Sequence, residues 1–233
     1  MARLHREVMR SVIERIARGD WAPGEMLPRE QDLAERFGIS RGVARECIQA
    51  LEDRGVIRVK HGRGSTIASP AEWNLLDPVV LEGLLAAPGG RALAAEMLEA
   101  RLAVEGELGA LAARRAGEGH VAELREAVER MAELGGRRRL AEEEADQLDA
   151  AERAFQRALA AAAGNRLLGR TLVPLQGATP LGAASPLARV RAVDGYSAVL
   201  DAIAAGDEDA ARTAVHDLVE GAAPAGARRD ASS

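Results

Sequence analysis

Three long polar side chains recur at every fourth residue between Arg41 and Gln49, and their chemistry suits contact with nucleic-acid bases. Arg41, Arg45 and Gln49 stand at positions i, i+4 and i+8, so a helix would place them on one face. The planar guanidinium group of arginine can donate two parallel hydrogen bonds to O6 and N7 of guanine. The spacing therefore predicts a solvent-facing helix surface that contacts DNA.

A second basic group surrounds a glycine-rich turn. Lys60, His61 and Arg63 flank Gly62, and strand-forming residues stand on both sides of them. Glycine lets the main chain of such a turn come close to a phosphate or enter a minor groove. We expect a β-hairpin whose basic tip contacts DNA.

The elements that must position these residues can be read from the pattern around them. An apolar face predicts a helix from Leu4 to Ala17, and a second helix over 29–37 should end at Gly38. Ser40 is a good N-cap for a third helix, from Arg41 to Arg54. Two short helices joined by such a turn form a helix-turn-helix, and the hairpin adds a wing.

Residues 4–68 resemble the winged helix-turn-helix domain of GntR-family bacterial transcription regulators. The segment that carries this resemblance is GDWAPGEMLPREQDLAERFGISRGVARECIQALEDRGVIRVKHGRGSTIA. The resemblance implies DNA contacts at Ser40, Arg41, Gly42, Val43, Arg45, His61 and Gly62. Many family members have arginine where this chain has Gln31, and here an arginine stands two places earlier, at Arg29. We therefore add these two residues to the candidate DNA contacts, together with Gln49, Lys60 and Arg63.

The rest of the chain is expected to be helical. Glycine or proline separates helices that we expect near 91–117, 119–135, 140–163, 165–177, 186–205 and 207–221. The predicted fold class is mainly α, with a winged helix-turn-helix over 1–69 and an antiparallel helical bundle over 91–221. Residues 70–90 are expected to form a linker helix, broken at Pro78, and residues 222–233 a disordered tail.

The bundle resembles the FCD ligand-binding domain of the FadR subgroup of GntR regulators. The segments that carry this resemblance are MLEARLAVEGELGALAARRA, ERAFQRALAAAAGNRLL and DGYSAVLDAIAAGDEDAARTAV. The resemblance implies an interior pocket for a small organic acid, often bound through a metal. It also implies a homodimer that presents two DNA-binding heads to a short inverted repeat in double-stranded DNA.

The metal ligands of that family are largely replaced in this chain. The family pattern D-x-x-F-H aligns with the segment from Glu152 to Gln156. The family has two further histidines: one aligns with Tyr196 of this chain, and the other falls at or near Leu218. His216 is two residues from Leu218, which is about 200° around a helix. Amide, phenol and aliphatic side chains bind divalent transition metals poorly or not at all, so we predict no metal and no other cofactor.

A pocket without histidine can still bind an anion directly. Arg101 matches an arginine that family members commonly point into the pocket, and a guanidinium suits a carboxylate or phosphate. Glu152, Gln156 and Tyr196 would then supply polar contacts to an anionic metabolite. The alternative is that Arg101 forms an ion pair inside the bundle, with Glu105 or Glu152.

Composition limits the remaining functional classes. The 233 residues are 47% hydrophobic but only 2% aromatic, which favours an aliphatic helical core over a large β-sandwich. Residues 1–69 carry 13 Lys and Arg against 10 Asp and Glu, whereas the remainder carries 18 against 26. The single cysteine, Cys47, excludes an internal disulfide, and we expect a small buried residue there in preference to a reactive thiol.

These observations favour a cytoplasmic transcription regulator, expected to be a repressor, with no membrane partner. No apolar run is long enough for a membrane span, and the first residues lack a signal-peptide pattern. No phosphate-binding glycine loop, nucleophile elbow or HExxH motif suggests an enzyme. Two alternatives stay open: a constitutive DNA-binding dimer whose bundle only dimerises, and a metal-dependent ligand sensor.

Overall fold

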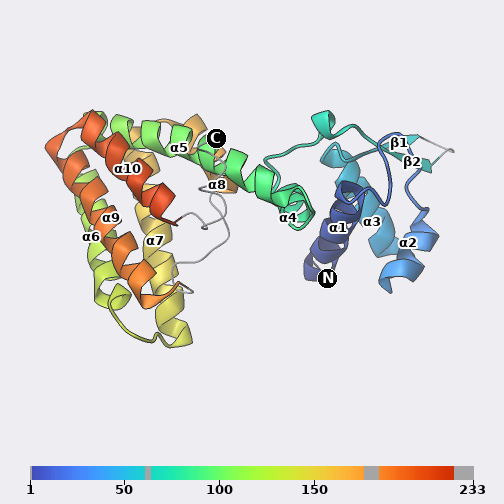
Figure 1. Cartoon of the computed structure of the whole chain (residues 1–233), viewed down its shortest axis with the longest axis horizontal. Coiled ribbons are helices and arrows are strands. Elements are labelled where there is room, and N and C mark those ends of the chain that lie inside the picture. Colours follow the sequence, from blue (N-terminus) through green and yellow to red (C-terminus); the bar gives the residue numbers. More distant parts are fainter. Residues whose placement is uncertain (1, 61–63, 176–183, 223–233) are drawn as a thin grey trace. The chain divides into compact units, whose positions relative to one another are not determined.

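The chain folds into two compact units, Met1–Ala94 and Ala95–Ser233 (Figure 1). The computed structural model describes residues 2–60, 64–175 and 184–222. The predicted mainly α fold class is confirmed. Each unit has its own buried hydrophobic cluster.

The first unit is a winged helix-turn-helix. Its elements are α1 (Ala2–Ala17), α2 (Glu30–Phe37), α3 (Arg41–Asp53), β1 (Ile57–Lys60) and β2 (Gly64–Ile67). The two strands pair antiparallel, with Ile57 opposite Ile67 and Lys60 opposite Gly64. Ile13, Leu33 and Leu51, from the three helices, are almost fully buried in one core with Ile57.

The turn between α2 and α3 fixes the direction of the predicted recognition helix. Gly38 ends α2 in the left-handed conformation, with φ 62°, which a glycine adopts without steric strain. Ser40 then begins α3 as its N-cap, since its hydroxyl oxygen accepts a hydrogen bond from the Val43 amide at 3.2 Å.

The expectation of one linker helix broken at Pro78 is wrong. A 3-10 turn, η1 (Pro70–Glu72), is followed by α4 (Pro78–Leu85), which begins at this proline. Asp77 caps α4 by accepting hydrogen bonds from the amides of Val79 and Val80, at 2.9 and 3.3 Å. Proline at the first helical position sacrifices no helical hydrogen bond, so it starts the helix. Helix α4 packs against α1 within the first unit.

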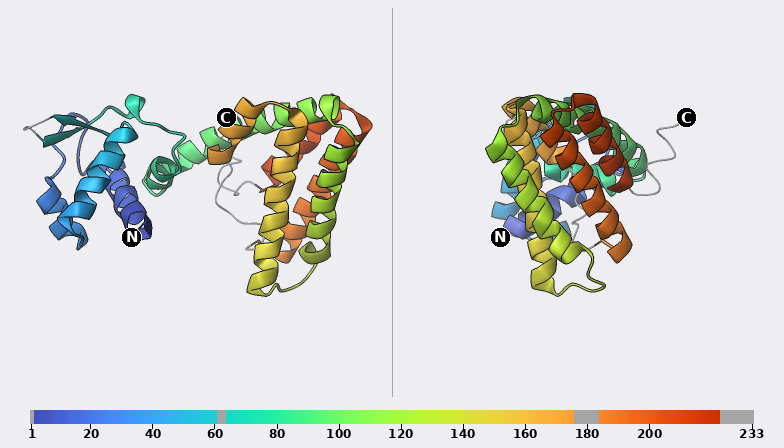
Figure 2. Two further views of the ribbon diagram at one scale, coloured as in Figure 1. Left: turned by 180° about the vertical axis from the view of Figure 1, so that it is seen from behind. Right: turned by 90° about the vertical axis from the view of Figure 1, so that its left-hand side faces the viewer.

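The second unit is an antiparallel helical bundle. Its elements are α5 (Gly90–Arg115), of which the residues from Ala95 onward belong to this unit, α6 (Glu118–Gly135), α7 (Glu142–Ala163), α8 (Arg166–Leu175), α9 (Pro186–Ala205) and α10 (Glu208–Ala222). Figure 2 shows α6, α7, α9 and α10 running side by side, and the largest contacts join α6 to α7 and α9 to α10. Its described residues contain no strand. The predicted tail lies outside the described residues, apart from Ala222, which ends α10.

A buried arginine connects α9 to the end of α6. The side chain of Arg189 on α9 is 4% exposed. Its guanidinium donates to the main-chain oxygens of Ala184 at 2.6 Å, Gly135 at 3.4 Å and Arg137. A cation here also interacts favourably with the negative end of the α6 dipole.

Among the described helices, none combines the length and the apolar composition that a membrane span requires.

Candidate functional site

The predicted DNA-contacting face of α3 is exposed. Arg41, Arg45 and Gln49 all face solvent, while the opposite face of α3 packs into the core of the first unit. The Gln49 amide nitrogen donates to the Asp53 carboxylate at 3.3 Å. The sequence spacing therefore correctly placed these three side chains on one accessible surface.

The basic side chains of the first unit fall into two groups. Some arginines are held by acidic neighbours: Arg6 by Glu82, Arg15 by Asp20, Arg18 by Glu14, Arg54 by Asp77 and Arg58 by Glu72. Arg36 instead lies over the ring of Trp21, 5.4 Å from its centre. Other basic side chains are exposed and make no hydrogen bond or ion pair within residues 2–60 and 64–94: Arg10, Arg29, Arg41, Arg45 and Lys60.

Apart from Arg10, this unpaired group consists of candidate DNA contacts. We call Arg29, Arg41, Arg45 and Lys60 the free basic set. The main-chain amide of Arg29 donates to Asp32 at 3.2 Å, but none of these four side-chain cations forms an ion pair within the described residues. Such a cation need not break an ion pair before it meets a phosphate or a base edge. The structure thus separates basic side chains that are free to meet an anionic partner from arginines that are already paired with acidic side chains.

The other candidate DNA contacts have mixed surroundings. Gln31 is exposed on α2, and its amide nitrogen donates to Glu35 at 3.1 Å. Gly42 is exposed, whereas the side chain of Val43 packs partly against the core. The wing candidates His61, Gly62 and Arg63 lie outside the described residues.

In the second unit, the candidate effector residues come together in one polar cluster. The Tyr196 hydroxyl on α9 donates to Glu152 Oε1 on α7 at 2.8 Å. The ring of Phe155 meets that of Tyr196 edge to face, with centres 4.8 Å apart. Burial raises the pKa of Tyr196 well above its usual value, the Glu152 carboxylate raises it further, and a hydrogen bond from Gln156 opposes the change. Tyr196 is therefore a neutral hydrogen-bond donor in this cluster.

Arg101 forms the internal ion pair that was the alternative to a ligand-binding role. Its Nε donates to Glu105 Oε1 at 2.8 Å, one helical turn along α5. Glu105 is 1% exposed, and burial raises the pKa of its carboxyl group, against the opposing effect of Arg101. The terminal nitrogens of Arg101 make no hydrogen bond within the part of the chain that the structure describes. In the sequence, Glu105 is only a possible partner of Arg101, because nothing about a glutamate in a helix indicates that it is buried.

One acceptor in this cluster is left without a donor. The side-chain oxygen of Gln156 is buried and accepts no hydrogen bond from the described residues. A buried polar atom without a partner costs about 1–3 kcal/mol, so it marks a place where a ligand or water would be stabilised. The structure thus brings all four effector candidates, Arg101, Glu152, Gln156 and Tyr196, into one region of the bundle.

The residues present do not fit a transition-metal centre. Leu218 packs beside Gly195, and the Nε2 atom of His216 lies 3.1 Å from the Leu102 carbonyl oxygen. That contact makes Nε2 a donor to the main chain, so only Nδ1 of this ring keeps a lone pair. Among the described residues, no three His, Cys, Asp or Glu side chains form a group that could hold a metal ion.

Cys47 is buried in the core of the first unit. Burial and, to a smaller extent, Glu46 raise the pKa of its thiol to about 11. A thiol with such a pKa is almost entirely protonated at neutral pH and so is a poor nucleophile. Its position agrees with the interpretation as a small core residue.

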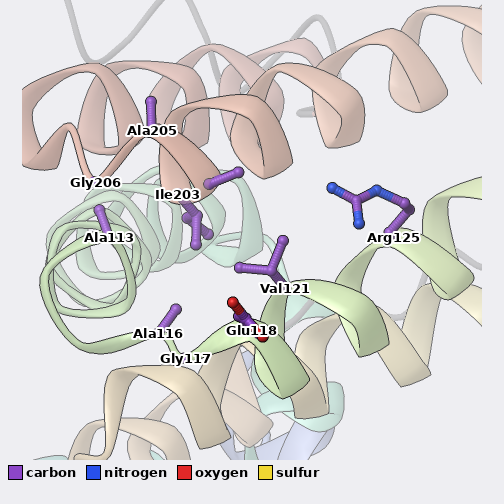
Figure 3. A pocket seen from close by; sticks show the side chains of 10 residues that line it. Ala113, Ala116, Gly117, Glu118, Val121, Arg125, Ile203, Ala205 and Gly206 are labelled. Atoms are coloured by element: carbon purple, nitrogen blue, oxygen red, sulfur yellow. The ribbon is translucent and has the colours of Figure 1, made fainter.

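A separate hollow opens at another end of the bundle (Figure 3). It has a volume of about 490 Å³ and lies between the end of α5, the start of α6 and the end of α9. Apolar side chains, including Val121 and Ile203, form much of its lining, and Glu118 and Arg125 are its charged residues. None of the effector candidates lines this hollow.

Comparison with protein families gives two matches that follow the two units. Residues 4–67 match the family of bacterial regulatory proteins named gntR, and residues 96–221 match the FCD domain. The second match alone covers more than half of the chain.

Individual relatives agree with these matches. The galactonate operon transcriptional repressor of Escherichia coli is 34% identical over 118 residues, which are 51% of this chain and 52% of that protein. The regulator LutR of Bacillus subtilis is 31% identical over 153 residues, 66% of this chain and 65% of LutR. The fatty acid metabolism regulator of Yersinia pestis is 28% identical over 166 residues, 71% of this chain and 65% of that protein. The chain spans about half the length of the first curated relatives that it matches.

One solved structure shares the fold at low sequence identity. The structure of Lar, described as controlling the expression of the Listeria monocytogenes agr system, has a TM-score of 0.56 at 17% identity, with 93% of each chain covered. The two family matches agree with the folds of the two units, a winged helix-turn-helix and a helical bundle. This chain belongs to the gntR family of bacterial regulatory proteins, in the group whose members also carry an FCD domain.

Proposed function

We propose that the protein is a cytoplasmic, sequence-specific DNA-binding transcription repressor that acts as a homodimer. The free basic set carries this proposal, because exposed cations without acidic partners lie on and beside the predicted recognition helix. In a winged helix-turn-helix, the second helix of the motif enters the major groove. Arg41 and Arg45 on α3 would then contact base edges, while Arg29 and Lys60 would contact phosphates.

Dimerisation would set the form of the DNA site. Two copies related by a twofold axis present two equivalent recognition helices, so the operator should be a short inverted repeat. A repressor bound at such a site blocks transcription by occlusion. The galactonate operon relative is named as a repressor, which supports this direction of control.

The helical bundle would control DNA affinity through a small-molecule effector. We propose an anionic metabolite whose acid group meets the terminal nitrogens of Arg101, with Glu152, Gln156 and Tyr196 as polar contacts. The named relatives concern galactonate and fatty acids, both carboxylic acids. An effector changes DNA affinity only by as much as its affinity differs between the two arrangements of the dimer.

A purely dimerising bundle is the second candidate. The ion pair of Arg101 with Glu105 and the hydrogen bond of Tyr196 with Glu152 favour it, because they engage groups that an effector would use. A thermal-shift screen of small carboxylates, sugar acids and acyl-CoAs separates the two candidates. A stabilising compound that also releases DNA supports the sensor, and a screen without any shift supports the dimerising bundle.

DNA recognition itself is tested by selection from genomic fragments. The full chain is incubated with the fragments at physiological ionic strength, and the bound DNA is sequenced. We expect enrichment of one inverted repeat. Recovery of fragments without any shared sequence would contradict the proposed function.

A further inference from the structure

The α7 and α9 residues of the polar cluster form a hydrogen-bonded unit. Glu152 and Gln156 are one turn apart on α7, and Tyr196 faces them from α9. The Tyr196 side chain is 4% exposed and its hydroxyl donates to Glu152 Oε1. In this unit the proton of the tyrosine hydroxyl, a positively polarised hydrogen, already contacts the carboxylate.

The protonation state of Tyr196 decides what this unit can bind. A phenol must lose its proton to become a good metal ligand. Burial and the neighbouring Glu152 and Glu105 carboxylates all keep the proton on Tyr196. A metal at this position would have to displace a buried hydrogen bond and would then face a neutral phenol and a neutral amide.

We infer that the hydrogen bond from Tyr196 to Glu152 takes the place of a metal–carboxylate bond in this chain, and that the effector's acid group is bound directly by Arg101. This inference rests on the proposed function in one respect: it assumes that an effector binds at the cluster. It adds that recognition needs no metal, and that a chelator leaves the response to effector unchanged.

A metal titration of the full chain tests the replacement without any need for DNA or effector. The protein is stripped with EDTA, exchanged into buffer, and titrated with Zn²⁺ and with Ni²⁺ by calorimetry, and the retained metal is counted by mass spectrometry. We expect no stoichiometric binding to the unaltered chain. One bound ion per chain that is lost in both Glu152→Gln and Tyr196→Phe would overturn the inference.

A gain-of-binding variant tests the geometry of the same three positions. The double variant Gln156→His/Tyr196→His leaves Glu152 in place and adds two imidazoles beside it, a ligand set that suits Zn²⁺. We expect this variant to gain one Zn²⁺ per chain. The control, Arg153→His/Ala198→His, adds two imidazoles to exposed positions of the same helices and should gain none.

Two further outcomes are decisive. A folded double variant that binds no Zn²⁺ would contradict the inference that these side chains occupy the position of a metal. If the double variant does not fold, the single variant Tyr196→His is titrated in the same way, with Ala198→His as its control. If the protein bound no DNA and no effector, the proposed function would be refuted. The number of metal ions bound per chain would still test this inference.

Discussion

The buried side chain of Arg189 should contribute more to the stability of the second unit than most other single side chains. Replacement by methionine keeps most of the side-chain volume and removes every hydrogen bond to the carbonyl oxygens of Ala184, Gly135 and Arg137. Hydrogen bonds to a charged donor contribute about 1.5–3 kcal/mol each. The bond to Gly135 is long, at 3.4 Å, so we count the other two at the lower value and expect a loss of about 3 kcal/mol.

The assay for Arg189→Met is denaturant unfolding followed by helical circular dichroism, together with a thermal melt. A loss of about 3 kcal/mol corresponds to a fall in Tm of about 10 °C for a unit of this size. Amide hydrogen exchange should increase most at the end of α6, where the carbonyls lose their donor. The matched control is Arg191→Met, because Arg191 is exposed on the same helix and makes no hydrogen bond or ion pair within the described residues. Equal stabilities of the two variants would refute this account of Arg189.

Three further predictions concern two buried side chains and one half-buried glycine. The pKa of Glu105 is raised in the folded protein, so the protonated carboxyl group stabilises the fold at low pH, and this contribution is lost as the pH rises through the folded pKa. Glutamine does not titrate, so we expect Glu105→Gln to gain stability relative to the unaltered chain as the pH rises from 4 to 8. A melt series over this range that shows a constant difference would contradict the expectation. Cys47, whose pKa is raised to about 11, should resist iodoacetamide at pH 8 in the native protein and react fully in denaturant, as measured by mass spectrometry. Gly55→Ala should destabilise the first unit, since Gly55 has φ +72° and an added Cβ would lie 2.3 Å from the Glu72 carbonyl oxygen; an unchanged urea midpoint would argue against this close approach.

The helix-turn-helix could be predicted from sequence because its signals are local. Gly38 and Ser40 specify the turn within three residues, and the apolar repeat of α3 determines which face is exposed. The free basic set could be predicted only in part. In the sequence, nothing distinguishes Arg54 and Arg58 from Arg41 and Arg45. Only the fold brings acidic partners to Arg54 and Arg58.

Distant contacts decide the structure where the local sequence is ambiguous. A proline in an apolar stretch can break a helix or begin one, and at Pro78 the cap by Asp77 and the packing of α4 on α1 favour a beginning. The residues near Arg189 in the sequence do not predict its three acceptors. These are carbonyl oxygens just before α9 and at or just after the end of α6. In the same way, the burial of Glu105 follows from the helices around it and cannot be read from its neighbours in sequence.

The free basic set should bind DNA directly, and the affinity of one variant for the selected operator tests this most directly. The Kd of Arg45→Ala is measured by fluorescence anisotropy beside that of Arg18→Ala, which removes the same charge from an arginine that is paired with Glu14. We expect Arg45→Ala to lose about 1–3 kcal/mol, a factor of roughly 5–150 in Kd, while Arg18→Ala stays close to the unaltered protein. Equal affinities of the two variants, with both proteins folded, would contradict the claim that α3 reads the operator through this face.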